Sequence, residues 1–153
     1  MNTTNRNQPR QKRKYAADPT ALYRVMNKIQ PFTPDELTKL KTPVREAFER
    51  MRCGTGEEDH FHTLAAVVNV SLIRSESIDP FCVETCQRAQ AALMAMRGRF
   101  QRLGKWGFDS AALQDLPPVI DLHEQLLQMS TPLQMADAMQ ITINRMESGQ
   151  TLE

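Results

Sequence analysis

Five pairs in which a helix-capping residue directly precedes a proline constrain this chain most strongly. They are Asp18-Pro19, Thr33-Pro34, Thr42-Pro43, Asp79-Pro80 and Thr131-Pro132. An Asp or Thr oxygen can accept a hydrogen bond from a first-turn N–H that has no partner within the helix. Proline at the first helical position lacks only an N–H that would stay unpaired. Each pair therefore predicts a helix start, and at Thr33 the capping box is complete because Glu36 follows three residues later.

Between these starts, apolar residues recur at three- and four-residue steps, as amphipathic helices require. We therefore expect one all-α domain over residues 15–149, a compact bundle of about six helices joined by short loops. Pro43 either kinks the helix that begins at Pro34 or restarts it after Thr42, and we favour the restart. Pro117-Pro118 predicts another start after a brief helical turn at residues 111–113. The expected helices cover residues 19–30, 34–53 with its restart at Pro43, 60–73, 80–103, 118–129 and 132–147.

Residues 60–73 contain no Asp, Glu, Lys or Arg. Val67, Val68 and Val70 would also suit a strand, but the strict alternation of a half-buried strand is absent. A helix that is apolar on nearly every side is buried all round. We expect this helix to form the centre of the core.

The 153 residues are 41% hydrophobic and 24% charged, which is typical of a single globular domain. No apolar run approaches the roughly 18 residues of a membrane span, and the first residues lack the apolar run of a secretory signal. Cys53, Cys82 and Cys86 are too few, and odd in number, for a secreted disulfide scaffold. We expect a cytoplasmic protein with free thiols and no membrane association.

Charge is distributed unevenly along the chain. The formal net charge is +1, but residues 1–14 carry five basic side chains and no acidic one. Because this segment has no apolar residue after Met1, we expect it to be a disordered basic arm. The remaining residues are mildly acidic, and residues 150–153 form a C-terminal tail.

Histidine and cysteine spacing does not predict a metal site. His60 and His62 are two positions apart, so on a helix their side chains point away from each other. Cys82 and Cys86 lie four apart on a stripe of apolar residues that continues to Leu103, where cysteine behaves as a small core residue. Neither spacing matches the usual zinc motifs. We expect no metal and no cofactor.

Catalytic patterns are equally weak. Cys53 paired with His60 or His62 is the one conceivable nucleophile and base, and no phosphate-binding loop pattern occurs. His123, between Asp121 and Glu124, is expected to be solvated on a surface helix rather than to act as a general base. We expect a protein without enzymatic activity.

Nucleic-acid binding is an alternative, because basic side chains gather near aromatic ones. Trp106 and Phe108 follow an Arg-rich helix face, although they would also serve to fill the core. The face is equally explained as a solvated surface whose arginines pair with the surplus acids. The candidate nucleic-acid-binding residues are Arg10, Lys12, Arg13, Lys14, Arg88, Arg99, Arg102 and Lys105.

Partner-protein binding is favoured by methionine content. The chain has nine methionines, and flexible thioethers adapt to varied partners. In the last helix, a stripe of residues is expected to face the core: Leu133, Ala136, Met139, Ile143 and Met146. Met135 lies off this stripe and is therefore the candidate for an exposed partner contact.

Residues 58–66, the pair Asp79-Pro80 and residues 105–108 together resemble small accessory proteins of proteobacterial prophages and plasmids. The resemblance covers most of residues 33–149 and includes no catalytic motif. It implies a mobile-element context, in which small proteins bind host factors or regulate the element's genes. We therefore expect a protein-binding helical module that inhibits or regulates another protein, with nucleic-acid binding as the alternative.

Overall fold

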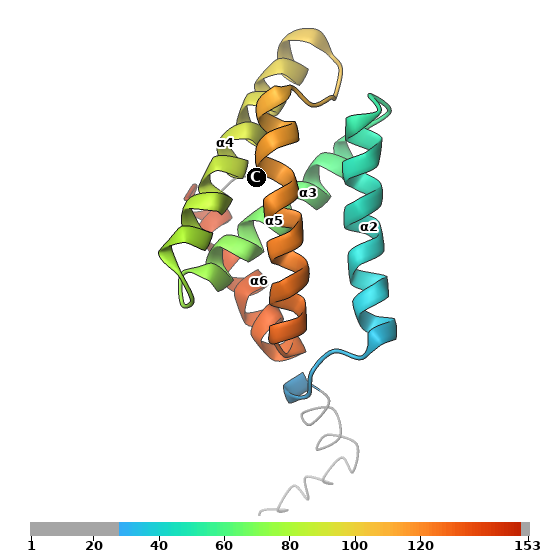
Figure 1. Ribbon diagram of the computed structural model, residues 1–153. Coiled ribbons are helices and arrows are strands. Elements are labelled where there is room, and N and C mark those ends of the chain that lie inside the picture. Colours follow the sequence, from blue (N-terminus) through green and yellow to red (C-terminus); the bar gives the residue numbers. More distant parts are fainter. Residues whose placement is uncertain (1–27, 151–153) are drawn as a thin grey trace, which may run out of the picture.

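Residues 28–150 are described by the computed structural model, and they fold into five helices (Figure 1). No strand occurs in this range, so the expected all-α fold is confirmed. The helix expected at residues 19–30 falls mostly outside the described residues, and the segment expected to be a basic arm falls wholly outside them. The helices are α2 (Pro34–Arg52), α3 (Glu58–Ser75), α4 (Pro80–Leu103), α5 (Ser110–Met129) and α6 (Pro132–Glu147).

Three of the five predicted helix starts are confirmed at the level of single hydrogen bonds. Thr33 and Thr131 each form a capping box, with Glu36 and Gln134 respectively. The Asp79 carboxylate accepts a hydrogen bond of 2.7 Å from the N–H of Phe81. Proline follows the cap in all three cases, so local chemistry alone sets these boundaries. Asp18-Pro19 lies outside the described residues.

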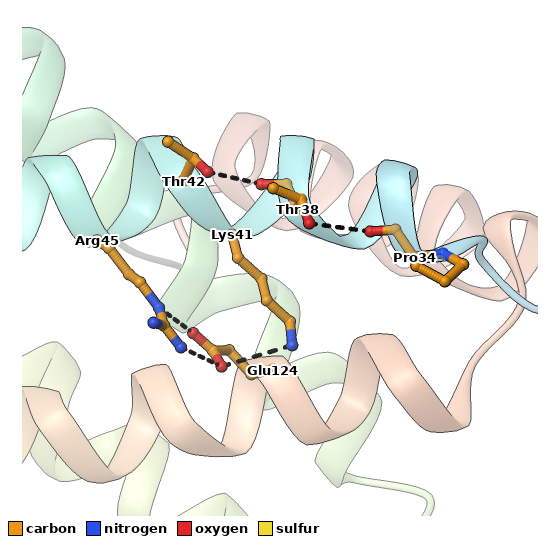
Figure 2. Close-up of polar contacts among 6 residues, drawn as sticks. All are labelled: Pro34, Thr38, Lys41, Thr42, Arg45 and Glu124. Atoms are coloured by element: carbon orange, nitrogen blue, oxygen red, sulfur yellow. Dashed lines mark hydrogen bonds and ion pairs between the residues drawn. The ribbon is translucent and has the colours of Figure 1, made fainter.

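The predicted restart at Thr42-Pro43 is wrong, because α2 continues through Pro43 without a break. The Thr42 hydroxyl donates to the carbonyl of Thr38, 2.8 Å away, instead of capping a new helix (Figure 2). Val44 and Met51, both beyond the proline, are buried. Burial of such side chains contributes about 1.5–3 kcal/mol each and offsets the roughly 3 kcal/mol cost of an interior proline.

The predicted start at Pro117-Pro118 is also wrong, since α5 is one helix from Ser110 to Met129. The expected turn at residues 111–113 is its first turn, capped by the Asp109 carboxylate. Leu116 and Val119 flank the two prolines and have no exposed surface. Their burial holds the α5 backbone helical across the prolines, and the described residues form five helices rather than about six.

The core is centred on α3, as expected from its uncharged sequence. This helix packs against α2, α4, α5 and α6, and it passes behind α5 in Figure 1. Phe61, Leu64 and Val68 are each 1% exposed. The stripe on α4 is buried at Cys86 and half-buried at Cys82, but Leu103, the last residue of the helix, is exposed and does not join the core.

The expected inward stripe of α6 is wrong. Ala138 and Thr142 are its buried residues, whereas Ala136 is exposed and Leu133, Met139 and Ile143 are each 40% exposed. Apolar residues occur on several sides of α6, and α3 is the helix of the described region with which it packs extensively. A helix held on one side leaves the others in solvent, so the sequence alone did not identify the buried side.

Candidate protein-binding groove

An apolar groove of about 400 Å³ lies between α2 and α6. Both helices pack against α3, but they make little contact with each other, so the surface of α3 between them is uncovered. The floor of the groove is formed by three residues on this surface of α3: Thr63, Ala66 and Val70. The volume falls within the roughly 300–1,000 Å³ of ligand-binding pockets.

The walls of the groove are apolar side chains from the flanking helices. Leu40 and Val44 extend from α2, while Met135 and Met139 extend from α6. Phe32, which precedes α2, closes the end near the turn between α5 and α6. A ligand in this groove would meet hydrocarbon and thioether surface on three sides.

His123 on α5 carries the one titratable side chain among the described residues that line the groove. It is buried, and its Nδ1 lies 3.2 Å from the hydroxyl oxygen of Ser71 on α3. Burial lowers the pKa of His123 from 6.5 to about 4, against a smaller opposing effect of the Glu124 carboxylate. The imidazole is therefore neutral at physiological pH.

The expectation that His123 is solvated is thus wrong. It follows Val119 by four residues and precedes Leu126 by three, so it shares their buried face of α5. That spacing was visible in the sequence. The acidic neighbours Asp121 and Glu124 favoured the prediction of a surface position instead.

No Ser or Cys side chain is among the described residues that line the groove, and the one hydroxyl there, that of Thr63, donates to the carbonyl of Asp59 at 2.9 Å. Ser71 is fully buried and does not line the groove. Cys86 is also fully buried, and burial raises the pKa of its thiol to about 11, so it stays protonated at neutral pH. Cys53 is exposed at the end of α2, while Nδ1 of His60 already accepts the backbone N–H of Glu57 at 3.0 Å.

Potential metal ligands are also dispersed. Within residues 28–150, no three His, Cys, Asp or Glu side chains come together in a way that could hold a metal ion. His60 and Cys53 belong to the end of the molecule where α2 meets α3, and Cys82 and Cys86 belong to α4. The three thiols of the protein are free.

An ion-pair cluster fixes the α2 wall of the groove to α5. The Arg45 guanidinium donates two hydrogen bonds to the Glu124 carboxylate, at 2.7 and 2.8 Å, and the Lys41 ammonium lies 3.6 Å from the same carboxylate (Figure 2). The hydrogen bond from Arg45 lowers the pKa of Glu124. Leu40 and Val44 are sequence neighbours of these cations, so the cluster holds their helix in place beside the groove.

The predicted Arg-rich face of α4 is largely engaged in ion pairs. Arg88 pairs with Glu84 and Asp115, and Arg99 pairs with Asp109, which caps α5. The aromatic residues beside this face fill the core, since Trp106 stacks on Phe61 and Phe100 at centroid distances of 4.8 and 4.0 Å. Arg102 and Lys105 are exposed and form no ion pair with the described residues. Arg10, Lys12, Arg13 and Lys14 lie outside them.

Met135, the predicted partner contact, lies in the groove. It is half-buried rather than exposed, and it packs against Val70, Ile73 and Ala138. The structure thus brings Met135 together with Met139, but it places neither of them near the Arg-rich face of α4. The groove itself was not predicted, because its existence depends on the gap between two helices that are distant in sequence.

Comparison of the chain with protein-family profiles, curated proteins and solved structures finds no match. Among the helices of the described region, none combines the length and the apolar character needed to cross a membrane.

Proposed function

We propose that the protein is a non-enzymatic protein-binding module whose groove between α2 and α6 takes an amphipathic helix of its partner. The observation that carries this proposal is the groove itself, whose described lining is apolar except for Thr63 and His123 and has no charged side chain at neutral pH. A helix inserted there would bury apolar side chains spaced by three and four residues. The protein would act in the cytoplasm as an inhibitor or regulator of that partner.

The two walls of the groove differ in how firmly they are held, and both properties favour the binding of a helix. Leu40 on α2 is 41% exposed and belongs to a wall held by the Glu124 ion pairs. Met139 on α6 is 40% exposed, and its unbranched thioether can change rotamer to fit a ligand. The fixed α2 wall would orient a bound helix, and the adaptable α6 wall would accommodate its side chains of different sizes.

The ion pairs of the α4 arginines make nucleic acid the less favoured ligand. Ion pairs already occupy Arg88 and Arg99, which would have to exchange acidic side chains for phosphates. The prophage or plasmid origin remains a prediction from the resemblance.

The proposal is tested by capture of partners from cells that produce the protein. Leu40→Glu and Met139→Glu each place a charge at an edge of the groove, and Leu113→Glu is the matched control because Leu113 is 46% exposed on α5 and outside the groove. We expect a nuclease-resistant protein partner to bind the wild type and Leu113→Glu, and to be lost with both groove variants.

Thermal unfolding of each variant establishes that the fold is intact. Retention of the partner by folded groove variants would contradict the proposed site. A captured complex that nuclease destroys, and whose affinity falls steeply with salt concentration, would favour nucleic-acid binding instead.

A further inference from the structure

His123 brings a polar ring into the groove between α2 and α6. Its Nδ1 lies 3.2 Å from the hydroxyl oxygen of Ser71 on α3, and its Nε2 forms no hydrogen bond with a described residue. No imidazole nitrogen is among the enclosed side-chain atoms of the described region that lack a partner. Nε2 is therefore accessible, and the groove is the opening that this side chain lines. The residue is only 8% exposed, so packing holds the ring in place.

The Ser71 hydroxyl determines which nitrogen of His123 carries the hydrogen. Thr63 and Thr142 donate to the carbonyl four residues earlier in their helices, as helical hydroxyls often do. No such bond joins Ser71 to Val67 among the described residues, and its hydroxyl is paired with Nδ1 of His123 instead. Because a buried hydroxyl requires an acceptor for its hydrogen, Ser71 donates to Nδ1. The neutral ring then carries its own hydrogen on Nε2.

Two polar side chains thus line the described groove, one with a donor and one with an acceptor. Nε2–H of His123 is the donor. Thr63 keeps an acceptor, because its hydroxyl hydrogen is donated to a backbone carbonyl of α3 at 2.9 Å. A primary amide complements this pair, since it has both a carbonyl oxygen and an NH2 group. A buried carboxylate would lack a counter-charge, because no cation lines the described groove, and Lys41 and Arg45 are paired with Glu124.

We propose that Nε2–H of His123 makes the groove specific for partner helices that carry an asparagine or glutamine within their apolar stripe. This inference rests on the proposed function, because it names the side chain by which a helix in the groove is recognised. The amide carbonyl of the partner would accept the hydrogen bond from Nε2. A helix with a purely apolar stripe would cover Nε2–H and leave it unpaired, which disfavours that helix. Ser71 is a positioning residue, since it holds the ring in the tautomer that donates.

The tautomer is tested by NMR of the full chain labelled with ¹⁵N in histidine, which distinguishes a protonated ring nitrogen from an unprotonated one. The His123 signals are identified by their absence from His123→Asn. We expect the Nε2–H tautomer in the wild type and a mixture of tautomers in Ser71→Ala. An Nδ1–H ring in the wild type would overturn the proposal, and an unchanged tautomer in Ser71→Ala would overturn the positioning role of Ser71.

Specificity is tested by selection from a displayed library of amphipathic helical peptides in which every position of the apolar stripe is randomised. The immobilised full chain is the bait. We expect the wild type to retain peptides with one Asn or Gln in the stripe. His123→Asn should lose this preference, because its shorter amide reaches Ser71 but not the groove. His123→Gln places an amide close to the position of Nε2 and should restore the preference.

Replacement of the amide residue by Leu in one selected peptide measures the effect. We expect this change to weaken binding to the wild type about tenfold, and to weaken binding to His123→Asn much less. The first of these values needs no variant of the protein, and thermal unfolding shows whether each variant used is folded. Equal or tighter binding of the Leu peptide to the wild type would overturn the role of His123.

Leu40→Glu separates this inference from the proposed function. Selected peptides that lose affinity for Leu40→Glu but have purely apolar stripes would overturn the role of His123 while leaving the groove as a helix-binding site. A selection that yields no peptide sensitive to Leu40→Glu would contradict both.

Discussion

Acid should destabilise this protein through His123. The imidazole is 8% exposed against Ser71, and burial lowers its pKa from 6.5 to about 4. A group whose pKa is lower in the folded state binds protons preferentially in the unfolded state at pH values between the two pKa values. The stabilisation from a neutral His123 is therefore complete above about pH 6.5 and is lost as the pH falls towards 4.

The size of the effect follows from the two pKa values. At pH 5 the unfolded histidine is almost fully protonated, whereas the folded one is protonated in only about a tenth of molecules. Linkage then predicts a loss of about 2 kcal/mol in the free energy of unfolding between pH 7.5 and pH 5, and of about 3 kcal/mol by pH 4. This is a large part of the 5–15 kcal/mol typical of a domain.

Urea denaturation at pH 7.5 and pH 5, followed by circular dichroism, measures this loss. Other groups also titrate in this range, so the reference is His123→Asn, in which the amide can still pair with the Ser71 hydroxyl. The difference between wild type and variant isolates the imidazole. We expect the wild type to lose about 2 kcal/mol more than the variant between these pH values. Equal losses would refute the assignment of His123 as buried and neutral.

Three further perturbations follow from the same structure. Val68→Asp should lower the free energy of unfolding by several kcal/mol, because it buries an unpaired charge at a position that is 1% exposed; an unchanged Tm would contradict the core. Cys53 should react with a thiol reagent in the folded protein while Cys86 reacts only after unfolding, which mass spectrometry of the labelled peptides would check. Glu124→Gln removes the acceptor charge that holds Arg45 and should lower the Tm at low salt, with a smaller difference between variant and wild type at high salt.

Helix starts were predictable because their causes are local. Thr33, Asp79 and Thr131 each satisfy an N–H within three residues of themselves, so no knowledge of the rest of the chain is required. The same holds for the buried character of α3, since a helix without charged residues has no side that favours water.

The prolines within helices were mispredicted because the outcome depends on distant contacts. The cost of an interior proline is local, but the compensating burial of Val44 or Val119 comes from α3 and its neighbours. The sequence shows the free-energy cost of the proline, but it does not show which side chains become buried by contacts with other helices. For α6 the difficulty was different, because apolar residues on several sides left its buried face undetermined.

The groove could not be predicted at all, although one of its residues was. Met135 was singled out for a partner contact because it lay off the expected stripe, and the structure places it in the groove wall for another reason, its packing on α3. A gap between α2 and α6 depends on the directions in which both helices cross α3. Those directions are properties of the assembled core.

We propose that the groove between α2 and α6 is where the protein meets a protein partner. Photo-cross-linking in cells tests it most directly, with a benzophenone amino acid replacing either Met139 or Ile141. The two residues are 40% and 42% exposed on α6, but Met139 lines the groove and Ile141 lies on another side of the helix. We expect a discrete cross-linked protein from position 139 and none from position 141. The reverse pattern, or the same product from both positions, would contradict it.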